Sequence, residues 1–139
     1  MSSSAQGWER PLPVPTSLSL PFWEATKRGV LRLQRCRVCK TYEWTPQMVC
    51  SHCLKDNLEW TDVSGRGRIY SFSVVHRPAT PGFRVPYVVG IVELDEGPRM
   101  LTNLDVDPAE VRIDMPVEVA FEDAGELALY RFRPRRISD

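Results

Sequence analysis

The sequence predicts a mainly β protein in which a short N-terminal helix and a metal-binding ribbon precede a small barrel or sandwich. Two observations carry this prediction. All four cysteines lie within the eighteen residues from 36 to 53, and the chain beyond Gly67 consists of short apolar segments separated by turn residues. With 139 residues, the chain has the length of one domain, or of one domain with a small appendage.

The N-terminal helix is expected just after residue 17. Ser19 is suited to its N-cap, Pro21 to its first turn and Gly29 to the position after its last turn. Its two aromatic residues, Phe22 and Trp23, are open to two interpretations. They either pack on their own domain or contact a partner.

The cysteines form two C-x-x-C pairs, Cys36 with Cys39 and Cys50 with Cys53, separated by ten residues. Each such turn places two thiolates on one side of a tight knuckle, and two knuckles supply the four tetrahedral ligands of a zinc ion. Four cysteines fill the coordination sphere and leave no open position. We therefore expect a structural zinc ion that stabilises the fold and performs no chemistry.

Strand-like segments at residues 30–35 and 58–63 flank this window and are expected to frame the ribbon. The alternatives to zinc are a redox dithiol, iron, and cysteines that hold no metal. A redox role is disfavoured because no βαβ pattern surrounds either pair. His52 lies inside the second knuckle, where it is an alternative ligand to one of the cysteines.

The second half of the chain reads as five β-rich segments, which favours a five-stranded barrel or a sandwich. These segments span residues 68–76, 86–94, 99–104, 116–122 and 127–132. The expected organisation is a flexible, proline-rich arm (1–16), a helix plus ribbon (17–63) and a barrel domain (64–139).

Net charge and hydropathy limit which partners and which cellular compartment we expect for the protein. Lys and Arg together number 18, as do Asp and Glu, so the formal net charge is zero. Proteins that bind nucleic acid usually carry a basic excess, which makes such a role unlikely here. The N-terminus does not read as a signal peptide, and no apolar run approaches the roughly 20 residues that span a bilayer. We expect a cytoplasmic protein that does not bind membranes, in a compartment where disulfides are rare.

The order of these parts resembles the domain-of-unknown-function thirty-five (DUF35) family. The resemblance covers residues 18–134 and rests on the four-cysteine window together with the segments PFWEATKRGVLRLQRC, WTDVSGRGRIYSFSVVHRP, PYVVGIVELDEGPRMLTNL and VRIDMPVEVAF. It implies a rubredoxin-like zinc ribbon joined to a five-stranded OB-type barrel. Three positions depart from the family pattern, because Lys40, Leu54 and Asp114 stand where glycine is usual.

The resemblance also implies a function. Members of the family are accessory subunits of thiolase-like enzymes: thiolases, related acyltransferases and retro-aldolases of steroid side-chain degradation. By this resemblance, the chain is expected to be a non-catalytic subunit of a hetero-oligomer. It would help to bind or enclose the acyl-CoA substrate, a coenzyme A thioester, while the partner supplies the catalytic residues.

The candidate contact residues for the partner or for coenzyme A lie in three places. The first is the helix, and the second is the proline-rich loop at 77–87, which either binds or merely connects two strands. The third is the arginine-rich C-terminal segment, which either meets coenzyme A phosphates, nucleic acid or an acidic partner, or is a solvated tail. The residues are Phe22, Trp23, Phe83, Arg84, Tyr87, Arg131 and Arg133.

Two rival functions stay open. Zinc ribbons and OB-type barrels also occur in nucleic-acid-binding modules. An enzyme in its own right is the second rival, with His76 as the candidate general base, although such a histidine is more often an ordinary surface residue. The sequence contains no G-x-S-x-G motif and no glycine-rich phosphate loop.

Overall fold

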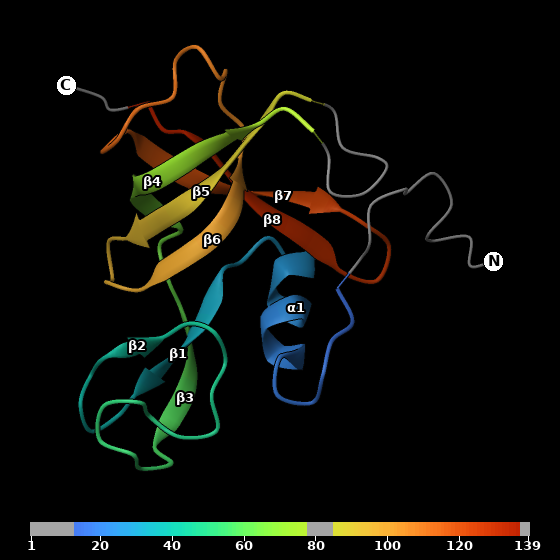
Figure 1. Ribbon diagram of the computed structural model, residues 1–139. Helices are drawn as coiled ribbons and strands as arrows, with labels where there is room; N and C mark the ends of the chain where they lie inside the picture. Colours follow the sequence, from blue (N-terminus) through green and yellow to red (C-terminus); the bar gives the residue numbers. More distant parts are fainter. Residues whose placement is uncertain (1–12, 78–84, 137–139) are drawn as a thin grey trace.

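A computed structural model describes residues 13–77 and 85–136 and confirms the mainly β fold. Figure 1 shows a three-stranded sheet at one end of the molecule, a five-stranded barrel at the other, and helix α1 beside both. The elements are α1 (Leu20–Lys27), β1 (Arg32–Cys36), β2 (Tyr42–Glu43), β3 (Leu58–Asp62), β4 (Arg66–Val75), β5 (Tyr87–Leu94), β6 (Arg99–Leu104), β7 (Pro116–Asp123) and β8 (Ala128–Pro134). No helix in the described part of the chain has the length and apolar character needed to cross a bilayer.

Helix α1 begins and ends where the sequence predicts, with Ser19 at the N-cap position and Pro21 in the first turn. Gly29 follows the helix with φ of 75°, and the N–H groups of Gly29 and Val30 donate to the carbonyls of Thr26 and Ala25 at 2.9 and 3.0 Å. These bonds form a Schellman motif, for which a left-handed glycine is suited. Ser19 does not cap the helix through its side chain. Its Oγ accepts the backbone N–H of Thr16 at 2.9 Å and makes no cap bond to the helix.

The ribbon sheet has the strand order β2-β1-β3, with both pairs antiparallel. Strands β1 and β3 lie where the sequence predicts them. Strand β2 was not predicted, because it has only two residues and offers no alternation to detect. The segments between the strands carry the two cysteine knuckles.

The barrel closes in the order β4-β5-β6-β8-β7, so the structure resolves the choice between barrel and sandwich. All its pairs are antiparallel except β6 with β8, which are joined in parallel at Leu104 and Phe132. The entry into β4 depends on two glycines. A Cβ atom at Gly65 would collide with the Val119 side chain, and one at Gly67 with the backbone carbonyl of Glu93. The Ser-Gly-x-Gly pattern is therefore required for β7 and β5 to approach β4 closely.

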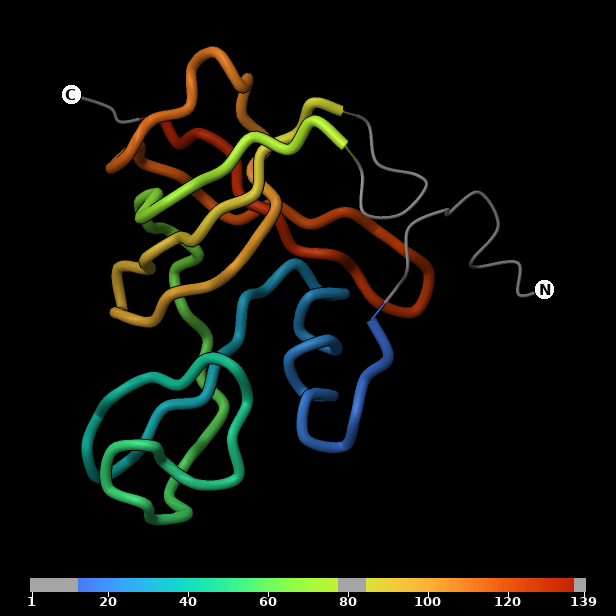
Figure 2. Tube along the Cα trace, in the orientation of Figure 1, coloured from blue at the N-terminus to red at the C-terminus, as the bar shows by residue number. Residues whose placement is uncertain are grey.

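One hydrophobic core runs through the ribbon, the helix and the barrel. Phe22 of α1 and Leu33 of β1 are completely buried in the same cluster as Ile69, Met100 and Phe132 of the barrel. The trace in Figure 2 shows how α1 lies against the lower end of the barrel, next to the ribbon. Ribbon and barrel are thus joined by packing as well as by the chain.

Four aromatic rings form the centre of this junction. The Phe22 ring lies 4.6 Å from that of Trp44 in the ribbon and 5.6 Å from that of Tyr130 in β8, measured between centroids. Trp23 packs edge-on against Phe22 at 4.8 Å. The Tyr130 hydroxyl donates to the Leu101 carbonyl at 3.1 Å, and burial raises the pKa of Tyr130 to about 12. The ring cluster therefore ties three parts of the fold together.

Candidate functional site

The four cysteine sulfurs converge at the tip of the ribbon. All of the Sγ atoms of Cys36, Cys39, Cys50 and Cys53 lie within 4.8 Å of one another, and those of Cys36 and Cys53 are 3.7 Å apart. A tetrahedral zinc ion with Zn–S bonds of about 2.3 Å requires sulfurs about 3.8 Å apart. The donor set and its spacing therefore fit zinc. His52 is exposed and is not part of this group.

Backbone N–H groups support the sulfurs in each knuckle. The N–H of Cys39 donates to Cys36 Sγ, and the N–H of His52 donates to Cys50 Sγ, both at 3.4 Å. Bonds from the backbone of Cys53 and of His52 lower the pKa of Cys50 to about 6. Hydrogen bonding to the Cys53 side chain, together with burial, raises the pKa of Cys39 to about 12. Metal binding to all four sulfurs must release protons, so the affinity falls as the pH is lowered.

The three departures from the family's glycines keep a glycine-like backbone. Lys40, Leu54 and Asp114 have φ values of 65°, 64° and 66° and are the non-glycine residues with positive φ in the described chain. Lys40 and Leu54 each follow the second cysteine of a knuckle, and their N–H groups donate to the carbonyls of Cys36 and Cys50 at 2.9 and 2.8 Å. The knuckles are therefore closed in spite of the substitutions, at the cost of backbone strain.

Changing Leu54 to glycine is expected to stabilise the ribbon by about 1 kcal/mol. A left-handed conformation costs a residue with a Cβ atom about 1–2 kcal/mol, and the Leu54 side chain is 74% exposed and contributes little packing. Thermal or denaturant unfolding of the metal-loaded protein measures the change. Leu54→Ala is the matched control, because it removes the side chain and keeps the strain. An equal gain in both variants would contradict the explanation.

The candidate contact residues of the helix differ in accessibility. Phe22 is completely buried in the core, so its assignment to a partner surface is corrected: its ring holds the fold together. Trp23 is partly exposed and borders a pocket of about 330 Å³ that also includes Leu20, Glu24 and Leu127. Trp23 therefore stays a candidate contact.

Of the three candidate contact residues in the 77–87 loop, the structure describes only Tyr87. Phe83 and Arg84 lie outside the described residues. Tyr87 is half-buried at the first position of β5, where it pairs with Val75 of β4. His76, the candidate general base, is exposed at the start of this loop.

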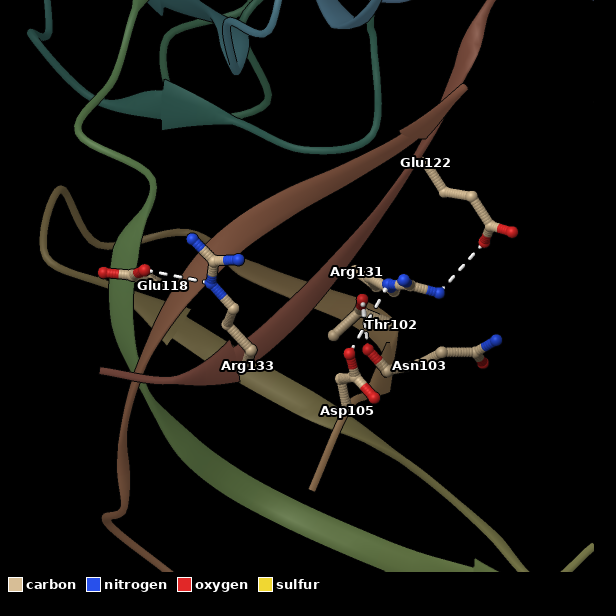
Figure 3. A network of polar contacts seen from close by, with 7 residues as sticks. All are labelled: Thr102, Asn103, Asp105, Glu118, Glu122, Arg131 and Arg133. Atoms are coloured by element: carbon tan, nitrogen blue, oxygen red, sulfur yellow. Dashed lines mark hydrogen bonds and ion pairs between the residues drawn. The ribbon is translucent and has the colours of Figure 1, made fainter. Parts of the chain in front are cut away.

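The two C-terminal arginines are already paired with carboxylates of the same chain (Figure 3). Arg131 donates to Glu122 at 3.0 Å and lies 3.7 Å from Asp105, while Arg133 donates to Glu118 at 3.0 Å. These pairs connect neighbouring strands of the barrel. Either arginine would have to leave its carboxylate, or share it, in order to bind a phosphate.

Sequence reasoning missed an apolar surface on the barrel. Alternate residues of β5 point outward, and three of them are apolar or aromatic: Tyr87, Val89 and Ile91. Ile91 pairs with Leu101 of β6, which is 65% exposed, and Tyr70 of β4 is 48% exposed beneath the Arg99 guanidinium at 3.9 Å. We call Tyr70, Tyr87, Val89, Ile91 and Leu101 the outer barrel face. The signal available in the sequence was that apolar residues occupy successive positions of β5 and therefore both of its faces. A strand with one solvated face normally alternates between apolar and polar residues.

Comparison with known families agrees with this architecture. Residues 23–59 match the family described as "ChsH2, rubredoxin-like zinc ribbon domain", and residues 60–122 match "ChsH2, C-terminal OB-fold domain". The chain belongs to the DUF35 family, since a "DUF35 domain-containing scaffold protein" of Methanocaldococcus jannaschii is 36% identical over 72% of this chain and 78% of its own length. The rubredoxin-like ribbon and the OB-type barrel implied by the resemblance are thereby confirmed.

Three relatives of this DUF35 chain are named as parts of enzymes. A solved structure of the "Ltp2-ChsH2(DUF35) aldolase" has a TM-score of 0.80 and 39% identity, over 88% of this chain and 98% of that chain. A "Probable enoyl-CoA hydratase alpha subunit" of Thermomonospora curvata is 43% identical over 81% of this chain and only 36% of its own length. "Benzoylsuccinyl-CoA thiolase subunit BbsA" of Geobacter metallireducens is 30% identical over 78% of this chain and 67% of its own length. The chain thus spans about a third of the hydratase subunit and most of the other two proteins.

Proposed function

We propose that this chain is a non-catalytic accessory subunit that binds a thiolase-like enzyme and helps to bind or enclose its acyl-CoA substrate. The observation that carries the proposal is the match to ChsH2(DUF35) of the aldolase, which covers 98% of that chain at 39% identity. The thiolase subunit BbsA supports the same role in a second enzyme class. The partner is a thiolase, an acyltransferase or a retro-aldolase, and it supplies the catalytic groups.

The proposal includes one structural Zn²⁺ ion, held by Cys36, Cys39, Cys50 and Cys53. Four thiolates fill its coordination sphere, so the ion would shape the ribbon and would leave the acyl-CoA chemistry to the partner. The C-terminal arginines are weaker candidates for coenzyme A than their sequence suggests, because both are engaged in ion pairs.

The outer barrel face is the surface that we assign to the partner. Its side chains are apolar or aromatic, and interfaces of permanent complexes are enriched in such residues. It also begins beside the 77–87 loop, since Tyr87 is both its first β5 residue and the end of that loop. A subunit bound there would lie next to the loop that we expect to help close the thioester site.

The decisive experiment is to identify the enzyme that co-purifies with the tagged chain and to assay its acyl-CoA reaction with and without the chain. We expect the partner to lose solubility or turnover when the chain is absent. Equal rates and equal solubility in both cases would refute the accessory role. Turnover by this chain alone would revive the enzyme hypothesis, and His76→Ala would then be the first variant to assay.

Leu101→Glu is expected to weaken the complex roughly 30-fold, the loss of about 2 kcal/mol that is typical of a central interface residue. The substitution places a charge on the outer barrel face, where the side chain is largely exposed before binding, so the fold itself is preserved. Titration of the purified partner measures the affinity. Met48→Glu is the control, because Met48 is 81% exposed on a ribbon loop. Equal losses in both variants would contradict this choice of surface.

The contacts of one barrel loop argue against the nucleic-acid alternative. OB-type barrels bind nucleic acid on the face of their second and third strands and with two of their loops, one of which corresponds to the loop between β7 and β8. In this protein that loop is held by α1: Lys27 Nζ donates to the Gly125 carbonyl at 2.6 Å and forms an ion pair with Asp123. Nanomolar affinity for random single strands, with a steep dependence on salt, would favour the alternative.

A further inference from the structure

The two cysteine knuckles are anchored to the ribbon in different ways. The first begins at the end of β1, where Cys36 pairs with Leu58 of β3 and its N–H donates to the Thr41 carbonyl at 2.9 Å. The second, from Cys50 to Cys53, lies in the long connection between β2 and β3 and belongs to no strand. Its ligands must therefore be placed by other contacts.

Two buried polar side chains make these contacts. Gln34 of β1 is 5% exposed, and its amide forms two bonds with the backbone of Gln47: it accepts the N–H at 2.6 Å and donates to the carbonyl at 2.8 Å. Glu43 of β2 is 9% exposed, and its Oε2 accepts the Ser51 hydroxyl at 2.9 Å and the Ser51 N–H at 3.4 Å. Ser51 directly follows Cys50, whose Sγ lies 4.0 Å from the same oxygen.

Gln34 and Glu43 are cross-strand partners in the sheet, so their side chains stand next to each other on one face. Together they hold the connection at Gln47 and at Ser51, on either side of the buried ligand Cys50. A buried carboxylate is costly unless it is hydrogen-bonded, and Glu43 has its described donors only in the knuckle. Its presence beside the Cys50 sulfur has no explanation in packing, because an apolar side chain would fill the same space without this cost.

We propose that Glu43, supported by Gln34, is a positioning residue of the metal centre that holds Cys50 at the zinc ion and slows release of the metal. The inference rests on the zinc centre proposed above and goes beyond it, because Glu43 is not one of the four ligands. Residues that orient a metal ligand by hydrogen bonding, without binding the metal themselves, typically contribute 10- to 100-fold to metal affinity.

The test is the rate at which zinc passes from the folded, reduced protein to an excess of a colorimetric chelator. Glu43→Ala is expected to release zinc 10- to 100-fold faster than the unmodified protein. Glu43→Gln keeps an oxygen that accepts the bonds of Ser51 and should stay within about threefold of the unmodified rate. Glu59→Ala is the matched control, because Glu59 is an exposed carboxylate on β3 of the same ribbon and should change nothing.

The spectrum of the cobalt-substituted protein separates positioning from a general loss of stability. We expect the visible bands of Co²⁺ to change in Glu43→Ala and to be unchanged in Glu59→Ala, since these bands report the geometry of the four sulfurs. Ser51→Ala removes the 2.9 Å bond and leaves the carboxylate in place, so it carries the test if Glu43→Ala does not fold.

Three results are decisive. Unmodified protein that binds no zinc would overturn the metal centre itself. Zinc binding with the same release rate and the same cobalt spectrum in Glu43→Ala would overturn this inference alone. Release from Glu43→Gln as fast as from Glu43→Ala would also overturn it, because the hydrogen bonds would then not matter.

Discussion

Cys50→Ser is expected to abolish zinc binding and to unfold the ribbon. Cys50 is completely buried among the four sulfurs, and a hydroxyl is a much poorer zinc ligand than a thiolate. Metal binding contributes folding energy on the order of 10 kcal/mol in small zinc domains, which is about as large as the total stability of a typical domain. Metal analysis after dialysis measures the loss of zinc, and hydrogen exchange locates the unfolded segment.

We expect the loss of protection to be greatest at residues 30–63 and smaller in strands β4–β8, whose backbone pairing does not involve the metal. Some loss of hydrogen-exchange protection is also expected in the barrel, because Leu33 of the ribbon lies in the same core as Phe132 of the barrel. His52→Ala is the control: it alters the same knuckle and should retain one zinc ion per chain. Zinc content unaffected by Cys50→Ser, or absent from the unmodified protein, would contradict the proposed centre.

Phe22→Ala is expected to destabilise the whole protein by about 3–5 kcal/mol, the usual cost of removing a buried aromatic ring. Phe22 is completely buried and contacts rings from the helix, the ribbon and the barrel, so no single part can close the cavity. Denaturant unfolding monitored by tryptophan fluorescence measures the change, because Trp23 and Trp44 lie next to the cavity.

Leu20→Ala serves as the control for helix propensity, since Leu20 is on the same helix but 43% exposed. It should cost less than about 1 kcal/mol. A small effect of Phe22→Ala, accompanied by loss of partner binding, would restore Phe22 to the partner surface and contradict its role in the core.

The sequence allowed most of the fold to be predicted because its signals were local. The cysteine spacing located the ribbon, the alternation of apolar residues located five barrel strands, and Gly29 located the end of the helix. Strand β2 was missed because two residues carry no periodicity. Ser19 is the N-cap residue as predicted, but its side chain makes no bond to the helix because a reciprocal bond with Thr16 competes for the same hydroxyl.

The partner surface was harder to predict because burial is decided by contacts between distant residues. Phe22 and Trp23 are adjacent aromatic residues with the same intrinsic preferences, and only the position of Trp44 and Tyr130 makes one of them a core residue. Arg131 looked free in a basic segment, yet Glu122 lies diagonally across from it on β7 and forms an ion pair with it. Such pairings depend on strand register, which the sequence of one strand does not specify.

The position of α1 has a consequence for the order in which the chain folds as it is synthesised. The helix is made early, but its binding site on the barrel includes residues of β8, the last barrel strand: Thr26 accepts the N–H of Ala128, 102 positions later, and Phe22 packs on Tyr130. Until these residues leave the ribosome, Phe22 has no complete site and its ring is exposed to water. The helix can therefore complete its docking only after β8 has been made, and until then the nascent chain exposes apolar surface that favours aggregation.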